Sequence, residues 1–159
     1  MALQKENKTL AKQIGCERKK ILVKIAPDLS LDAIDEVLQV CFDHSVDGII
    51  AVNTTISRDE LSAPTTEEGG LSGEPLWRRA YATVLYLSTK VEGRIPIIGV
   101  GGISTAQQAY EMLKYAHLIQ IYSSLIYKGP TIAHQINKGL KQLMLKDGIK
   151  HISEIRRGR

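Results

Sequence analysis

The sequence is poor in aromatic residues, has only two cysteines and contains no long apolar run. Phe, Trp and Tyr together make up 5% of the 159 residues, too few for a surface on which single-stranded nucleic acid stacks its bases. Cys16 and Cys41 form neither a disulfide framework nor a zinc-ligand spacing, so reduced thiols in a cytosol-like compartment are predicted. No apolar run reaches the roughly 18 residues of a membrane span, and the polar first 20 residues do not resemble a secretory signal. These absences predict a soluble, cytoplasmic chain.

Charge is distributed unevenly along the chain. Residues 1–20 carry six basic and two acidic groups, and residues 146–159 carry five and two, whereas residues 21–145 carry ten and thirteen. A nucleic-acid-binding protein is expected to spread basic residues over one face of its body, so no nucleic-acid partner is predicted. The four histidines show no ligand spacing, and no metal site is predicted: His44, His117, His134 and His151.

From residue 20 onward, short apolar runs alternate with helical patterns. The runs are nearly continuous in Ile, Leu and Val, which is typical of parallel strands covered on both faces; they span residues 21–25, 48–52, 95–100 and 118–122. The pattern divides the chain into an N-terminal helix within 1–19, a βα region over 20–146 and a basic tail over 147–159, which is predicted to be loose after Gly148.

Amphipathic helices are predicted between and after the strands. Ser30 is a helix cap, and the next apolar residues share one stripe from Leu31 to Phe42. Pro75 and Pro130 suit helix starts, and Ser104 with Gln107 forms a capping box. With a helix over residues 1–14, the order is α-(βα)₄. This α/β order fits half of a (β/α)₈ barrel or an open doubly wound sheet, and periodicity does not separate the two.

Polar and glycine residues follow the predicted strands at their carboxyl ends, where barrel enzymes assemble their sites. Lys24 lies within the first strand, where it either extends its amine to solvent at an edge or is buried beside a compensating anion. Asn53-Thr54-Thr55 forms either a capped turn or a ligand-binding loop. Gly101-Gly102 serves either a tight turn or the approach of a phosphate to backbone N–H groups.

The order of these motifs is more specific than any one of them. Lys24-Ile25-Ala26-Pro27-Asp28-Leu29, Asn53-Thr54-Thr55 and Gly69-Gly70-Leu71-Ser72-Gly73-Glu74-Pro75-Leu76 occur in sequence. They are followed by Ile95-Pro96-Ile97-Ile98-Gly99-Val100-Gly101-Gly102-Ile103, Gln120-Ile121-Tyr122-Ser123 and Lys128-Gly129-Pro130. From about residue 20 to about residue 145, the chain resembles the quinone-dependent, class 2 dihydroorotate dehydrogenases.

The resemblance implies the C-terminal half of a (β/α)₈ TIM barrel that binds FMN, oxidises dihydroorotate to orotate in pyrimidine biosynthesis and passes electrons to quinone. It assigns FMN contacts to Lys24, Val52, Gly73, Gly102, Tyr122 and Ser123, with Lys24 as the flavin lysine, and orotate contacts to Asn53 and Thr54. Val52 stands where the family usually has Thr, so only a backbone contact is retained there.

The resemblance also implies what this sequence lacks. The class 2 base is a serine in the first half of the barrel, so no catalytic residue is assigned here, and quinone is expected to bind through the N-terminal region of the parent enzyme. Parent enzymes are peripheral on the bacterial or mitochondrial inner membrane. A catalytically silent half barrel that binds FMN or phosphate, or a truncated gene remnant, is the alternative. The expected protein partner is the missing barrel half or a second copy.

Overall fold

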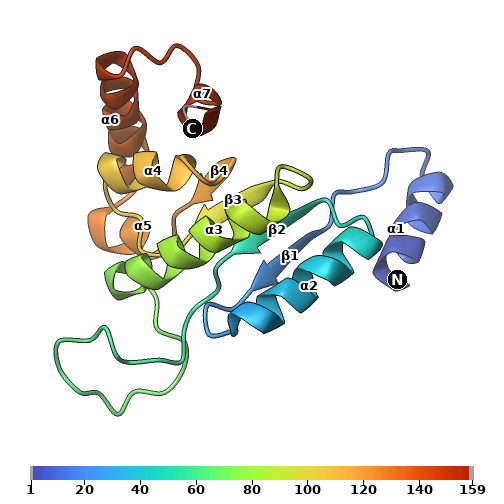
Figure 1. Cartoon of the computed structure of the whole chain (residues 1–159), viewed down its shortest axis with the longest axis horizontal. Helices are drawn as coiled ribbons and strands as arrows, with labels where there is room; N and C mark the ends of the chain where they lie inside the picture. Colours follow the sequence, from blue (N-terminus) through green and yellow to red (C-terminus); the bar gives the residue numbers. More distant parts are fainter. Residues whose placement is uncertain (1, 158–159) are drawn as a thin grey trace.

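The computed structural model describes residues 2–157. Met1, at the start of the predicted N-terminal helix, and residues 158–159, at the end of the predicted basic tail, lie outside the described residues. Four strands alternate with helices (Figure 1). The elements are α1 (Ala2–Gln13), β1 (Leu22–Ile25), α2 (Leu31–Asp43), β2 (Gly48–Ala51), η1 (Glu74–Leu76), α3 (Trp77–Val91), β3 (Ile97–Val100), α4 (Ala106–Leu113), β4 (Leu118–Gln120), α5 (Ser123–Lys128), α6 (Ile132–Lys146) and α7 (Glu154–Arg157).

The four strands form one parallel sheet in the order β1-β2-β3-β4. The doubly wound alternative requires the strand order to reverse at a switch point, and here it does not. Each strand pairs with the next along the chain, as in a (β/α)₈ barrel. The predicted α/β class and the partial barrel are therefore confirmed.

One face of the sheet is covered by helices and the other is bare. Figure 1 shows α2 and α3 together on one side of the strands. Ile49 and Ile97 face these helices and are buried, at 0% and 1% exposure. Their neighbours Ile50 and Ile98 point to the other face, because side chains alternate along a strand, and they are only half-buried. Lys24, Ile50, Ile98 and Leu118 form one row in register across this bare face.

The core lies between the sheet and its helices. In α2 the buried residues are Ile34, Leu38 and Cys41, and the Ser30 hydroxyl accepts the Ala33 N–H, confirming the predicted cap. Leu31 was expected in the buried stripe, but it is 56% exposed. It is the first residue of the helix, and its side chain is not covered there.

Three local predictions are wrong. The cap of α4 is Thr105, whose hydroxyl accepts the Gln108 N–H at 3.1 Å, one residue later than the predicted Ser104–Gln107 box. A short helix, α5, spans Ser123–Lys128, whereas the predicted α-(βα)₄ order has a single helix after the fourth strand, beginning at Pro130. The tail carries the helical turn α7, and Ile155 is 5% exposed, so packing of this side chain into the core orders the segment.

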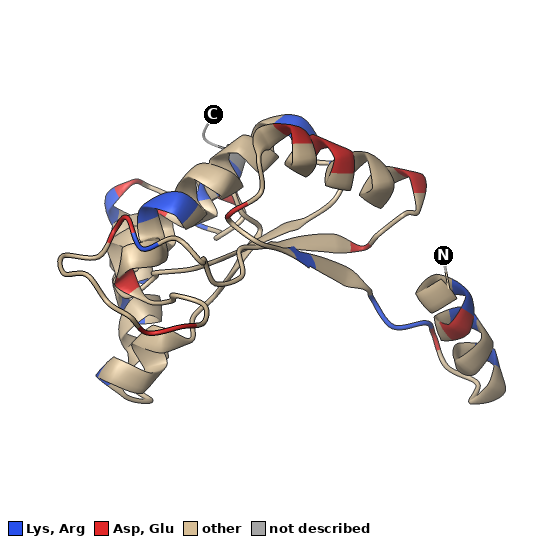
Figure 2. Ribbon diagram, turned by 90° about the horizontal axis from the view of Figure 1, so that it is seen from below, with Lys and Arg blue, Asp and Glu red and all other residues tan. Residues whose placement is uncertain are grey.

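Helix α1 stands apart from the sheet and is joined to it by polar contacts (Figure 1). Gln4 donates to the carbonyl of His44 at 2.8 Å. In the linker after α1, Arg18 forms a bidentate ion pair with Asp47, and Asp47 also accepts the Ile21 N–H. Figure 2 shows basic residues along α1 and this linker. Within residues 2–157, no helix is long and apolar enough to cross a bilayer.

Candidate functional site

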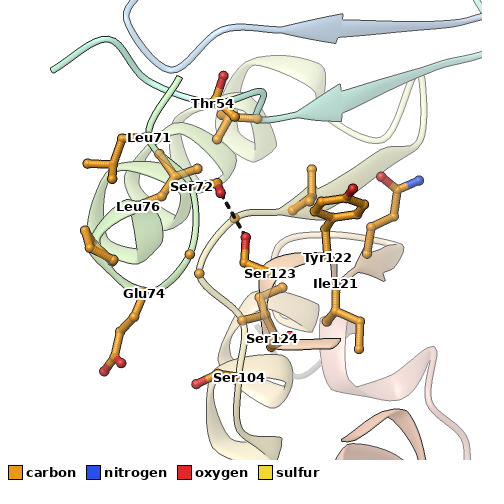
Figure 3. A pocket seen from close by; sticks show the side chains of 18 of the residues that line it. Thr54, Leu71, Ser72, Glu74, Leu76, Ser104, Ile121, Tyr122, Ser123 and Ser124 are labelled. Atoms are coloured by element: carbon orange, nitrogen blue, oxygen red, sulfur yellow. Dashed lines mark hydrogen bonds between the residues drawn. The ribbon is translucent and has the colours of Figure 1, made fainter. Parts of the chain in front are cut away.

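A cavity of about 680 Å³ lies at the carboxyl ends of the four strands. This volume is within the range of small-molecule and cofactor sites. Figure 3 shows side chains from several loops around it. Every predicted site residue is in its lining: Lys24, Val52, Asn53, Thr54, Gly73, Gly102, Tyr122 and Ser123. The structure therefore brings together residues that are spread over about 100 positions of the sequence.

Lys24 enters the cavity from β1 on the bare face of the sheet. Its side chain is exposed, and it makes no hydrogen bond or ion pair within the described part of the chain. A buried ammonium was one of the two expectations, and for this chain it is wrong. Burial would need something to cover the bare face of the sheet, whereas α2 and α3 lie on the opposite face (Figure 1). The cation is therefore solvated and available to an anionic ligand.

The loop after β2 supplies Val52, Asn53 and Thr54. Val52 is 2% exposed, and its N–H donates to the Val100 carbonyl at 2.9 Å. Its carbonyl accepts no backbone hydrogen bond from the part of the chain that the structure describes, so it is the backbone group left for a contact. The Asn53 N–H donates to the Ile25 carbonyl at 2.7 Å, which fixes the backbone at this point. The side chains of Asn53 and Thr54 are exposed and line the cavity.

The glycine-rich segment before η1 is held against this loop. Thr55 and Leu71 exchange two backbone hydrogen bonds, at 3.1 and 2.7 Å, in an isolated antiparallel bridge. Gly70 packs so closely on Thr54 that an added Cβ would lie 2.0 Å from the Thr54 hydroxyl. This approach carries Ser72 and Gly73 to the cavity. The Ser72 and Ser123 hydroxyls are hydrogen-bonded at 2.9 Å, which links the segment to the start of α5 (Figure 3).

The turn after β3 contains Gly101 and Gly102, both with positive φ, at 126° and 69°. A Cβ on Gly102 would lie 2.6 Å from the Trp77 backbone, so the turn packs directly on the start of α3. The tight-turn role is therefore confirmed. The N–H groups of Gly101, Gly102 and Ile103 donate to no acceptor within residues 2–157, so they remain available to a ligand.

Hydroxyl groups and a cation lie beyond β4. Tyr122 is 74% exposed, and the buried hydroxyl of Ser124 has no hydrogen-bond partner within the described residues. Lys128 also lines the cavity and donates to the Ser104 carbonyl at 3.0 Å. Sequence reasoning did not select Ser72, Ser124 or Lys128 as site residues. Their position in the sequence could have identified them, because each lies in or next to one of the motifs that carry the family resemblance.

Two features of the lining suit a ligand that combines a phosphate with a ring system. Unpaired backbone N–H groups, the partnerless Ser124 hydroxyl and Lys128 are donors of the kind that hold a phosphate. Apolar side chains such as Leu71, Leu76 and Ile121 provide contact surface for a ring system. Within residues 2–157, no three His, Cys, Asp or Glu side chains are grouped for a metal ion.

The buried titratable groups outside the cavity have structural roles. The ring of His117 accepts the Ile97 N–H at 3.1 Å, and burial lowers its pKa. Cys41 is buried in α2, and burial raises the pKa of its thiol, which makes it a poor nucleophile.

Comparisons with known proteins agree with this geometry. A family model described as dihydroorotate dehydrogenase matches residues 2–144. The chain is 49% identical over 144 residues to a "Dihydroorotate dehydrogenase (quinone)" of Chloroflexus aurantiacus, covering 87% of this chain and 40% of that protein. It is 42% identical over 145 residues to a protein of the same description from Allorhizobium ampelinum, covering 89% and 40%.

A solved structure agrees as well. Ligand-free DHODH from Eimeria tenella superposes with a TM-score of 0.83 at 33% identity, covering 89% of this chain and 41% of that chain. This chain therefore spans about two fifths of the length of the curated relatives that it matches.

Proposed function

The chain belongs to the dihydroorotate dehydrogenase family, and on that premise we propose that it supplies the FMN and orotate contacts of a quinone-dependent enzyme. The proposed reaction oxidises dihydroorotate to orotate in pyrimidine biosynthesis. In this proposal, residues 20–146 are the C-terminal half of the barrel and carry the site, flanked by the helical segment 1–19 and the basic tail 147–159. The supporting observation is that all eight predicted ligand contacts line one cavity.

FMN, when bound, supplies the acceptor for the hydride that leaves C6 of dihydroorotate. Lys24 would supply a cation near the flavin ring, where negative charge develops on reduction, and would stabilise that charge electrostatically. The carbonyl of Val52 and the backbone at Gly73 contact the cofactor. Gly102, Tyr122 and Ser123 hold its phosphate end, where the unpaired N–H groups and the Ser124 hydroxyl are found.

Asn53 and Thr54 orient the substrate. An amide offers both donors and an acceptor, and a hydroxyl offers one donor and two acceptor positions. Both side chains are exposed toward the cavity, while their backbone is fixed by the Asn53–Ile25 hydrogen bond. This combination of a fixed backbone and free polar side chains suits recognition of a ring with amide and carboxylate groups.

We place the base that accepts the C5 proton outside this chain. Among the described residues, the cavity lining contains no histidine or cysteine, and its one carboxylate is that of Glu74, which is exposed. The lining serines Ser72 and Ser123 are hydrogen-bonded to each other, and within residues 2–157 neither hydroxyl is hydrogen-bonded to a basic side chain. The proposed partners are dihydroorotate, the other half of the barrel, which would carry the base, and quinone bound through the N-terminal region of the enzyme at the bacterial or mitochondrial inner membrane.

Two measurements on the purified chain test the proposal. Titration with FMN, followed by quenching of flavin fluorescence, should show saturable binding that riboflavin, which lacks the phosphate, does not match. Dihydroorotate-dependent quinone reduction should be negligible for the chain alone. Absence of FMN binding would overturn the cofactor assignment, and robust turnover by the chain alone would overturn the placement of the base.

The alternative is a silent half barrel that binds FMN or phosphate but belongs to no active enzyme. The lack of a base partner in the lining is the observation that favours it. Mixing the chain with the preceding segment of a class 2 relative separates the two. Recovery of quinone reduction supports the enzyme, and FMN binding without any recovery supports the silent module.

A further inference from the structure

Asp28 is the charged side chain that joins three segments behind the cavity. It follows β1, and its side chain is 23% exposed. The hydroxyl of Thr55 donates to one carboxylate oxygen, and the Ile56 N–H donates to the other at 3.2 Å. Arg79, on α3, forms an ion pair with it at 3.2 Å. One carboxylate thus holds the loops after β1 and β2 and the first turns of α3 together.

Thr55 passes this constraint on to two groups of cavity residues. It is 4% exposed and directly follows Thr54, so fixing its side chain fixes the exit of the Asn53-Thr54 pair. Its backbone pairs with Leu71, which precedes Ser72 and Gly73. The Asp28 carboxylate is therefore connected, through Thr55, to both the predicted orotate contacts and the segment that carries Gly73.

We propose that Asp28 is a positioning residue that sets the placement of Asn53 and Thr54 for the substrate. Asp28 is absent from the residues that line the cavity, so it acts through Thr55 rather than by touching a ligand. The inference rests on the proposed function for its ligand but not for its geometry. A carboxylate accepts several hydrogen bonds at once and has no donor of its own when ionised, which is what the three donors around it require.

The test compares Asp28→Asn with the matched control Asp32→Asn, which removes the same charge from an exposed position in the first turn of α2. Asparagine retains one acceptor oxygen but presents an NH₂ group to the other donors, so Asp28→Asn leaves donors unpaired. Amide hydrogen exchange is measured at Thr55 and Leu71, whose N–H groups form the bridge, and at Leu87 in the core. We expect at least about tenfold faster exchange at Thr55 and Leu71, and little change at Leu87.

Ligand titrations distinguish a positioning role from a general loss of stability, because the positioning role predicts a change in orotate affinity with little change in FMN affinity. In Asp28→Asn, the orotate Kd of the FMN-loaded chain should rise about tenfold, while the FMN Kd changes less than about threefold. Thr55→Ser, which keeps the hydroxyl, should retain orotate affinity, and Thr55→Val should lose it as Asp28→Asn does. An unchanged orotate Kd in Asp28→Asn, or an equal rise in Asp32→Asn, would overturn the proposal.

The two proposals fail separately. If the wild-type chain binds neither FMN nor orotate, the proposed function fails, and hydrogen exchange still decides the role of Asp28. Faster exchange confined to the bridge then supports it. Unchanged exchange at Thr55 and Leu71, or an equal increase at Leu87, overturns it.

Discussion

Gly102 offers the sharpest test of how the turn after β3 shapes the cavity. The substitution Gly102→Ala places a Cβ at 2.6 Å from the backbone of Trp77, where the chain cannot move aside as a flexible side chain could. It also forces alanine to adopt φ of 69°. The matched control is Gly93→Ala, because Gly93 has φ of 78° and open space around its missing side chain.

The difference between the two variants isolates the contact with Trp77. A left-handed alanine costs about 1–2 kcal/mol, and the lower entropy of the unfolded chain returns about 0.4–1 kcal/mol. Gly93→Ala should therefore destabilise the fold by about 0–1.6 kcal/mol. Overpacking adds about 1–3 kcal/mol, so we expect about 1–4.6 kcal/mol for Gly102→Ala, which is about 1–3 kcal/mol more than for Gly93→Ala.

Urea unfolding at pH 7, followed by circular dichroism, measures both free energies of unfolding. FMN titration in the absence of urea gives the functional consequence: Gly102→Ala should raise the FMN Kd at least about tenfold, because the turn no longer presents its N–H groups in the same positions. Gly93→Ala should leave the Kd unchanged. Equal free energies for the two variants would refute the packing argument, and an unaltered Kd for Gly102→Ala would refute the role of the turn in binding.

Three further predictions concern charge and titration. The bidentate hydrogen bonds from Arg18 hold the pKa of Asp47 well below its usual range. The ionised carboxylate therefore stabilises the fold above pH of about 4, and this contribution is lost as the pH falls toward the folded-state pKa. Urea unfolding between pH 7 and 3 should show a steeper loss of stability for wild type than for Asp47→Asn. Burial, together with a 2.5 Å hydrogen bond to Asp147, raises the pKa of Tyr110 to about 12. The free energy of unfolding should therefore decline as the pH rises above about 10. Tyr110→Phe should remove this decline when unfolding is measured as a function of pH. Lys24→Met should raise the FMN Kd about tenfold by removing a cation from the cavity, whereas the exposed Lys138→Met should leave it unchanged; equal effects of both lysine variants would contradict a local role for Lys24.

The predictable part of the fold and site has a common physical origin. Continuous apolar runs identified the four strands, and the parallel arrangement then placed the loops after them at one edge. The resemblance assigned eight contacts, and their convergence on one cavity follows from that edge. What each contact does to a ligand remains a prediction, because convergence alone does not measure binding.

The features that sequence reasoning missed depend on contacts between distant segments. Ser104 and Thr105 are adjacent hydroxyl residues, and only the path of the chain decides that Thr105 is the cap. The exposure of Lys24 depends on what covers the bare face, which its own strand does not specify. The hydrogen bonds from Thr55 and Ile56 to Asp28 connect two different loops, and no periodic pattern in the sequence predicts contacts between loops.

The sequential strand order has a consequence for biosynthesis. Because β2 pairs with β1, β3 with β2 and β4 with β3, each strand meets its partner among residues that the ribosome has already released. The chain can therefore be assembled in the order of its translation, one βα unit at a time. The β2–β3 step closes the longest loop, which contains the Thr55–Leu71 bridge. Its closure entropy makes it the slowest of the three pairings, and synonymous changes of codon speed should affect yield most within this stretch.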